Sequence, residues 1–220
     1  MRGAGVEAMK DLPCIVMAAT VWAYWFCVGA MIVRVRRRTR KLSGLVPSQR
    51  VEQLMWIVWV PLVTAWMLLP YAAAGASSLP WRLPAFVGEM PMPLLRWAAA
   101  AVGLACLGLS VHCWLRMGRN WRMAVAPDQQ TELVTTGLYG LVRHPIYALS
   151  ILLMVCTLVV VPTLPVLAMA VVHIGMMLAK ARNEERFLAG RHGVDYLRYM
   201  QRTGRFVPRL RALVGARDAS

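Results

Sequence analysis

The apolar residues of this chain gather in long unbroken stretches, and polar residues are rare within them. Three stretches, residues 12–33, 54–74 and 94–115, are each long enough to cross a bilayer as a helix, which takes about 20 residues. Two shorter apolar runs, residues 146–161 and 164–179, follow a polar interval. The pattern predicts an all-α polytopic bundle of about five transmembrane helices.

The two shorter runs are separated by a break that contains Pro162 and Pro165. Proline lacks an amide donor and clashes with the preceding helical turn, so a single helix cannot continue through both positions. We therefore expect a tight helical hairpin over residues 146–180. Such a hairpin brings the polar residues at its start close to those at its end.

The basic residues predict the orientation of the spans. Residues 34–50 hold seven of the 25 Lys and Arg residues, and the chain from residue 116 onward holds fourteen. Loops rich in Lys and Arg remain in the cytoplasm, so five spans place the N-terminus outside and the C-terminus in the cytoplasm. The charges follow the first span, whereas those of a cleaved signal peptide precede it, so we expect this span to be retained. The expected location is a bacterial inner membrane.

Composition supports the membrane interpretation and excludes other classes. The 220 residues are 59% hydrophobic and 16% charged, against about 25% charged for soluble domains. The net charge of +15 accompanies no nucleic-acid-binding motif, and we assign it to membrane anchoring and contact with anionic lipids. The five cysteines lie in apolar stretches without C-x-x-C spacing, so no metal site is expected.

The polar residues that could carry chemistry flank the predicted hairpin. Arg143, His144 and Tyr147 stand at its start, and Lys180 and the pair Glu184-Glu185 stand at its end. Ionisable groups beside a membrane need partners or water. Their convergence would create a site that is half in the membrane and half in water, suited to a charged cofactor and a lipid-soluble partner.

Several short motifs follow one another between residues 118 and 208. They are Gly118-Arg119-Asn120-Trp121, Leu133-Val134-Thr135-Thr136-Gly137-Leu138-Tyr139, Arg143-His144-Pro145-Ile146-Tyr147, Asn183-Glu184-Glu185 and Gly193-Val194-Asp195-Tyr196-Leu197-Arg198-Tyr199. In this order and spacing they resemble the isoprenylcysteine carboxyl methyltransferase family and the related phospholipid methyltransferases. The resemblance covers roughly residues 118–208, and the length of the chain allows a single membrane domain over residues 1–220. Within it, residues 12–115 would be a three-span scaffold and residues 116–210 the cofactor-binding half.

The resemblance also implies S-adenosylmethionine as cofactor and assigns roles to residues. The implied cofactor-binding residues are Leu133, Val134, Tyr139, His144, Pro145, Tyr147, Glu184 and Tyr196. The implied substrate-binding residues are Lys180, Arg119 and Asn120, and the candidate bases are His144 and Glu185. Lys180 stands where the family often carries an arginine, so it keeps the charge but loses bidentate recognition of a carboxylate. No metal is implied.

Structural roles compete with these assignments. His144 could cap a helix, Lys180 and Glu184 could form an i,i+4 pair, and Tyr196 could belong to an amphipathic surface helix. His112 and His173, inside apolar spans, are interpreted as neutral and hydrogen-bonded to neighbouring helices.

The sequence therefore predicts a membrane methyltransferase acting on a hydrophobic or lipid-embedded acceptor with a carboxylate, a thiol or an amine. Carboxylates and thiols rank above lipid amines. An NADPH-dependent enzyme similar to membrane sterol reductases and a non-enzymatic membrane scaffold remain alternatives. The oligomeric state stays open.

Overall fold

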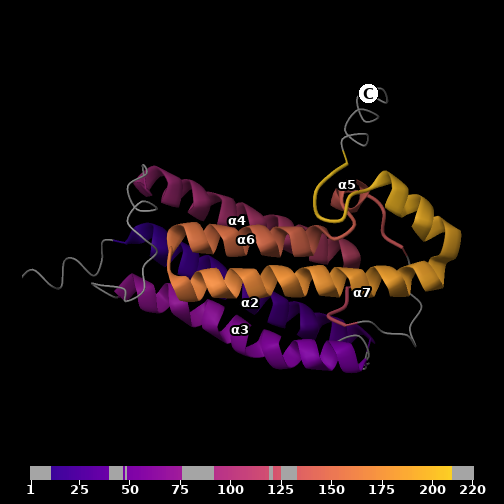
Figure 1. Ribbon diagram of the computed structural model, residues 1–220, viewed down its shortest axis with the longest axis horizontal. Helices are drawn as coiled ribbons and strands as arrows, with labels where there is room; N and C mark the ends of the chain where they lie inside the picture. The colour runs from indigo at the N-terminus through magenta and orange to yellow at the C-terminus, as the bar shows by residue number, and fades with distance from the viewer. Residues whose placement is uncertain are drawn as a thin grey trace, which may run out of the picture.

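The computed structural model describes residues 11–39, 47, 49–75, 92–118, 121–124 and 133–209. The described elements are helices: α2 (Leu12–Thr39), α3 (Arg50–Gly75), α4 (Met92–Met117), α5 (Leu138–Leu141), α6 (Pro145–Val160) and α7 (Leu164–Arg202). Figure 1 shows the long helices lying side by side as a bundle, with α5 and the bent end of α7 at one end. No strand occurs in the described ranges, so the all-α prediction is confirmed.

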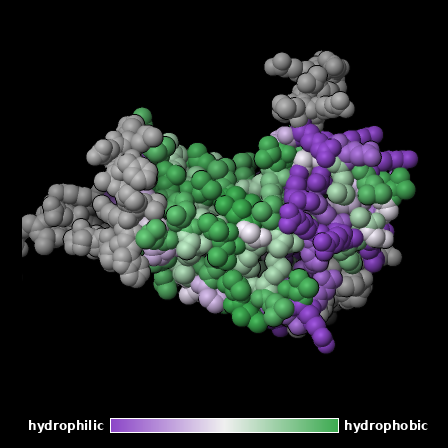
Figure 2. All heavy atoms as spheres, viewed as in Figure 1, coloured by the Kyte–Doolittle hydropathy of each residue, from purple (hydrophilic) through white to green (hydrophobic). Residues whose placement is uncertain are grey.

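Four of these helices, α2, α3, α4 and α7, are long and apolar enough to cross a membrane, and α6 is a shorter apolar helix of 16 residues. Figure 2 shows hydrophobic side chains over the length of the bundle and hydrophilic ones over the end where α7 bends. The polytopic bundle is thereby confirmed. The orientation of this end toward the cytoplasm stays a prediction.

The first span extends further than expected. We placed the start of a loop at residue 34, but α2 continues through Arg36, Arg37 and Arg38 to Thr39. Arginine is a good helix former, and its charge is favourable at a helix C-terminus, where the backbone dipole is negative. The basic run therefore forms the last turn of α2.

The core of the bundle lies where α4 packs against α6 and α2, and α2 against α3. A side chain on Gly103 of α4 would meet Met17 at 3.1 Å and Leu153 at 3.3 Å, so the missing side chain allows close approach of three helices. Trp66 of α3 donates its indole N–H to Thr157 of α6 at 3.0 Å. The hairpin is thus fixed to the N-terminal helices.

Helices α6 and α7 form the predicted hairpin. The turn is short, and the Thr163 side chain caps α7 by accepting from the backbone N–H of Val166 at 3.4 Å. Pro165 occupies the first turn of α7, where its missing N–H costs nothing. At the end of α6, Arg96 of α4 donates to the carbonyl of Val160 at 3.0 Å. The break therefore lies where the two prolines predict it.

The second arm does not end near residue 180. Helix α7 continues to Arg202, with a bend at Gly193, whose φ of 54° is unfavourable for residues with a side chain. The chain then returns to the start of α6, where Arg143 N donates to Gly204 O at 2.8 Å and His144 N to Arg205 O at 3.1 Å. Figure 1 shows this return beside α5. The C-terminal segment therefore lies against the first residues of the hairpin.

Candidate functional site

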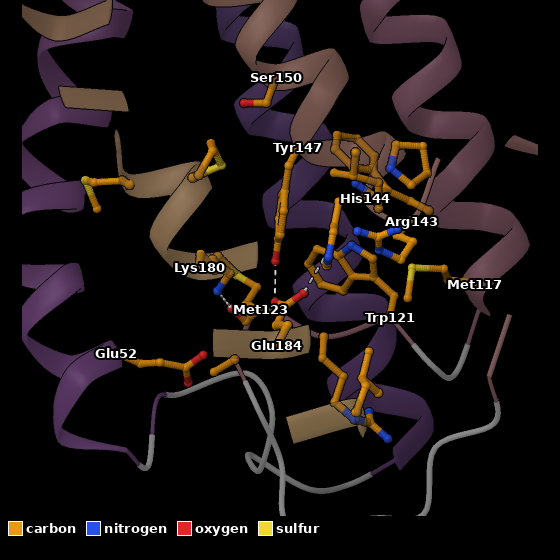
Figure 3. A pocket seen from close by; sticks show the side chains of 18 of the residues that line it. Glu52, Met117, Trp121, Met123, Arg143, His144, Tyr147, Ser150, Lys180 and Glu184 are labelled. Carbon is orange, nitrogen blue, oxygen red and sulfur yellow. Dashed lines mark hydrogen bonds and ion pairs between the residues drawn. The ribbon is translucent and has the colours of Figure 1, made fainter. Parts of the chain in front are cut away.

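A cavity of about 250 Å³ lies among α2, α3, α4, α6 and α7, and its lining includes Tyr196 and Tyr199, beyond the bend of α7. The hairpin supplies one wall, from Tyr147 and Ser150 on α6 and Lys180 and Glu184 on α7. Figure 3 shows Tyr147 of α6 and Glu184 of α7 pointing toward one another from the two arms. The lining is mostly apolar and aromatic, with a few charged groups, as ligand cavities usually are.

Glu184 contacts two residues at the start of the hairpin. The Tyr147 hydroxyl donates to its Oε1, and Nδ1 of His144 lies 3.6 Å from its Oε2. The rings of His144 and Tyr147 are stacked, with centroids 5.4 Å apart and planes 6° apart. The expected convergence of residues some forty positions apart is therefore present.

The local backbone explains how His144 reaches this position. His144 precedes Pro145 at the first position of α6, which proline favours because its φ suits a helix start. The imidazole is 7% exposed and also contacts Phe206 of the returning segment, at a centroid distance of 6.2 Å. His144 makes no side-chain capping bond, so the capping role is not observed.

Glu185, next to Glu184, faces another group of residues. Arg143 Nε donates to its Oε1 at 2.9 Å, and Arg205 donates to its Oε2 at 2.6 Å. The bond to Glu185 raises the pKa of the Arg205 guanidinium, so the charge on Arg205 persists. Glu185 is 4% exposed and is not among the residues that line the cavity. The structure therefore gives Glu185 a part in holding the C-terminal segment, and this favours positioning over the role of base.

Arg143 links this group to the backbone. Its Nη1 donates to the carbonyl of Met200 at 3.1 Å and to the carbonyl of Thr203. Nε2 of His144 lies 3.4 Å from Oε1 of Glu185, an ion-pair distance without a hydrogen bond. The arginine of the R-H-P motif is thus the centre of the contact between α6, α7 and the returning segment.

Two buried tyrosines also line the cavity. Tyr139 and Tyr196 are buried and line the cavity, and among the described residues neither hydroxyl has a hydrogen-bond partner. Burial raises the pKa of Tyr139, which keeps its hydroxyl protonated and able to donate. Tyr199 donates to the carbonyl of Tyr139 at 2.6 Å. Two unused hydroxyls on residues that line the cavity are suited to a polar ligand.

The remaining predicted residues divide into three groups. Leu133, Val134 and Pro145 line the cavity as expected. Lys180 lines it too, but its ammonium donates to the carbonyl of Met123 and forms no ion pair with Glu184 among the described contacts. Arg119 and Asn120 lie outside the described residues.

Sequence reasoning missed the contribution of the N-terminal half. The cavity is also lined by Glu52, Met55, Trp56 and Trp59 of α3, by Tyr24, Trp25 and Val28 of α2, and by Trp114 and Met117 of α4. A carboxylate at the start of an apolar span, with tryptophans four and seven residues later, was the available sequence signal. His173 was expected to bond a neighbouring helix, and it lies 3.0 Å from Ser150 of α6.

Comparison with known proteins identifies the part of the chain that holds the hairpin. Residues 100–190 match the model of the Isoprenylcysteine carboxyl methyltransferase (ICMT) family. This confirms the resemblance inferred from the motifs. The ICMT match covers most of α4, all of α5 and α6 and most of α7, and it includes His144, Tyr147 and Glu184. It supports a membrane methyltransferase.

Two curated relatives have names that refer to metal resistance. The cobalt-zinc-cadmium resistance protein CzcN of Cupriavidus metallidurans is 33% identical over 119 residues, covering 52% of this chain and 55% of the relative. The nickel-cobalt-cadmium resistance protein NccN of Alcaligenes xylosoxydans xylosoxydans is 29% identical over 115 residues, covering 52% and 53%. The matched part of this chain therefore spans about half the length of each relative.

Proposed function

We propose that the protein is an integral membrane methyltransferase that uses S-adenosylmethionine and acts on a hydrophobic acceptor. The observation that carries the proposal is the meeting of His144, Tyr147 and Glu184 around one cavity between a membrane hairpin and a polar end of the bundle. The ICMT match over the same residues supports it. The acceptor would enter from the bilayer.

The residues present fit this cofactor. Glu184 offers a carboxylate that can accept from the cofactor amino group or ribose, and Tyr147 fixes the position of that carboxylate. The unused hydroxyls of Tyr139 and Tyr196 can donate to it. S-adenosylmethionine supplies an activated methyl group on a sulfonium, so the chain needs only to orient the acceptor and exclude water.

The network around Glu185 would affect cofactor binding indirectly, by holding the residues that line the cofactor site in place. It fixes the segment at Arg205 beside His144, and His144 stacks on Tyr147. We assign Glu185 and Arg143 as positioning residues, and His144 as a wall of the cofactor site. The basic end of the bundle, which includes these residues, would face the cytoplasm.

Ligand binding tests the proposal directly. The purified protein should be stabilised against heat by S-adenosylhomocysteine and not by NADPH, because a bound ligand stabilises the folded state according to its affinity. Stabilisation by NADPH alone would favour the reductase alternative, and stabilisation by neither ligand would favour a scaffold.

A matched pair of variants then locates the site. Glu184→Gln should weaken S-adenosylhomocysteine binding about tenfold or more, since a hydrogen bond to a charged group contributes about 1.5–3 kcal/mol. Asp195→Asn changes a carboxylate that is 82% exposed and should bind like the wild type. If the wild type and both variants bind S-adenosylhomocysteine equally well, Glu184 is not part of the binding site.

The names of the relatives motivate a second proposal, a part in resistance to divalent metals. Among the described residues, no group of three or more His, Cys, Asp and Glu side chains could hold a metal ion. We propose that any such part depends on the methylation of an acceptor proposed above. Expression in a metal-sensitive bacterium should raise tolerance to cobalt or nickel, and Glu184→Gln should abolish the gain. Equal metal tolerance in cells that express the wild type and in cells that express Glu184→Gln would refute the link between methylation and resistance.

A further inference from the structure

A pair of polar side chains belongs to the cavity wall between the two apolar arms of the hairpin. Ser150 of α6 and His173 of α7 both line the cavity, and they are 4% and 0% exposed. The Ser150 hydroxyl lies 3.0 Å from Nε2 of His173. Both residues stand inside apolar runs, where polar groups are costly and are expected to have partners or a function.

The pair leaves one imidazole nitrogen unused. Among the described residues, the buried Nδ1 of His173 has no hydrogen-bond partner. The neighbouring Trp66 does not supply one, because its ring is inclined at 61° to the imidazole and its N–H donates to Thr157. A neutral imidazole has one donor and one acceptor nitrogen, so Nδ1 can donate or accept according to the tautomer.

A structural tie between the two arms explains the contact but not the unused nitrogen. A ligand hydroxyl would complete the pair, because a hydroxyl can both donate and accept and so suits either tautomer of His173. A charged group would be unsuited here, since the neighbouring lining residues Ile146, Met176 and Met177 are apolar. The chemistry of this part of the wall therefore favours a neutral oxygen group.

The pair lies apart from the proposed cofactor end of the cavity. Figure 3 shows Ser150 beyond Tyr147 along α6. On α7, His173 precedes Glu184 by eleven residues, about 16 Å at 1.5 Å per residue. An acceptor whose reacting group lies toward Glu184 would therefore place a later part of its apolar chain beside Ser150 and His173.

We propose that Ser150 and His173 form an acceptor subsite that recognises a hydroxyl group on the apolar chain of the acceptor. The inference rests on the proposed methyl transfer and narrows its acceptor to a hydroxylated, lipid-soluble molecule. This hydroxyl is bound and does not react, because the methyl group goes to the head group near the cofactor. The subsite thereby selects among hydrophobic acceptors that share one head group.

Matched thiols test this preference. Mercaptohexanol, mercaptononanol and mercaptoundecanol carry a thiol and a terminal hydroxyl, whereas hexanethiol, nonanethiol and undecanethiol lack the hydroxyl. Each is offered to the full chain in phosphatidylcholine nanodiscs with S-adenosylmethionine labelled on its methyl group. The measured quantity is the ratio of kcat/KM for the mercaptoalkanol to kcat/KM for the thiol of equal length. For at least one length, His173→Leu should lower this ratio about threefold or more, as expected for the loss of one hydrogen bond.

A matched control and a second variant make the result decisive. His112→Leu makes the same change at an exposed position of α4 that does not line the cavity, and it should keep the wild-type ratio. If His173→Leu does not fold, the smaller change Ser150→Ala should lower the ratio in its place. An unchanged ratio at all three lengths in the variant that folds would overturn the subsite.

Nitrogen NMR of isotope-labelled histidine side chains tests the subsite without methyl transfer. At least one mercaptoalkanol should shift the Nδ1 signal of His173, and the thiol of equal length should not. If the wild type does not bind S-adenosylhomocysteine, the proposed function fails, and the NMR result still decides whether the hydroxyl site exists. If it binds S-adenosylhomocysteine but no mercaptoalkanol shifts the His173 signal, only the subsite is overturned.

Discussion

Replacing Glu185 by Gln tests the network that holds the C-terminal segment. Glu185 and Arg143 have side chains that are 5% and 6% exposed, so their charges are almost fully removed from water. Arg205, the second partner of Glu185, is 31% exposed. The variant keeps the shape of the side chain and removes its charge, which leaves the Arg143 guanidinium buried without a counter-charge.

The magnitude follows from that burial. Removing one partner of a buried ion pair costs about 3–5 kcal/mol, and the exposed Arg205 adds up to about 1 kcal/mol. The hydrogen bonds from Arg143 to the carbonyls of Met200 and Thr203 remain in the variant, so we expect a cost at the lower end of this range. For a chain of 220 residues, about 3 kcal/mol corresponds to a Tm lower by roughly 6–12 °C.

The assay is thermal unfolding of the purified protein in detergent, followed by a thiol-reactive dye that reports exposure of the buried cysteines. Arg209→Gln is the control, because Arg209 is exposed and its side chain bonds only the carbonyl of Gln201 among the described contacts, at 2.7 Å. It should unfold within about 2 °C of the wild type. If Glu185→Gln also unfolds within 2 °C, the buried network does not stabilise the fold as argued.

Two further variants test the hairpin and the core. Tyr147→Phe removes the hydroxyl that donates to Glu184, and the affinity for S-adenosylhomocysteine in calorimetric titration should fall about five- to tenfold. Unchanged affinity would show that the bond does not orient the carboxylate. Gly103→Val should destabilise the protein by about 1–3 kcal/mol in thermal unfolding, because Met17 and Leu153 leave no room. Gly108→Val, with open space around it, is the control, and equal destabilisation would contradict the packing argument.

The fold and the hairpin side of the site could be predicted from the sequence because local signals determine them. Pro162 and Pro165 require a break, and the lengths of the apolar runs require helices on both sides. Antiparallel arms then bring His144 close to Glu184 without any knowledge of side-chain packing. This part of the site follows from chain connectivity alone.

The other parts depend on packing that one sequence does not specify. Glu52 enters the cavity only because α3 turns one particular face toward α7, and apolar spans carry little periodic signal about which face is buried. The partners of Glu185 include Arg205, which becomes its neighbour only through the bend at Gly193 and the return of the chain. The acidic pair is adjacent in sequence, yet its two carboxylates have separate surroundings.

The uninterrupted path of α7 from the turn of the hairpin to Gly193 has a consequence for ligand affinity. His173, deep among the lipid-crossing helices, and Glu184 lie on one rigid rod about 16 Å apart, at 1.5 Å per residue. A molecule that tilts this rod from the bilayer side must also shift the carboxylate at the other end. With the proposed cofactor at Glu184, binding on the lipid side and binding of the cofactor would then be thermodynamically linked, and each would change the affinity of the other by the same factor.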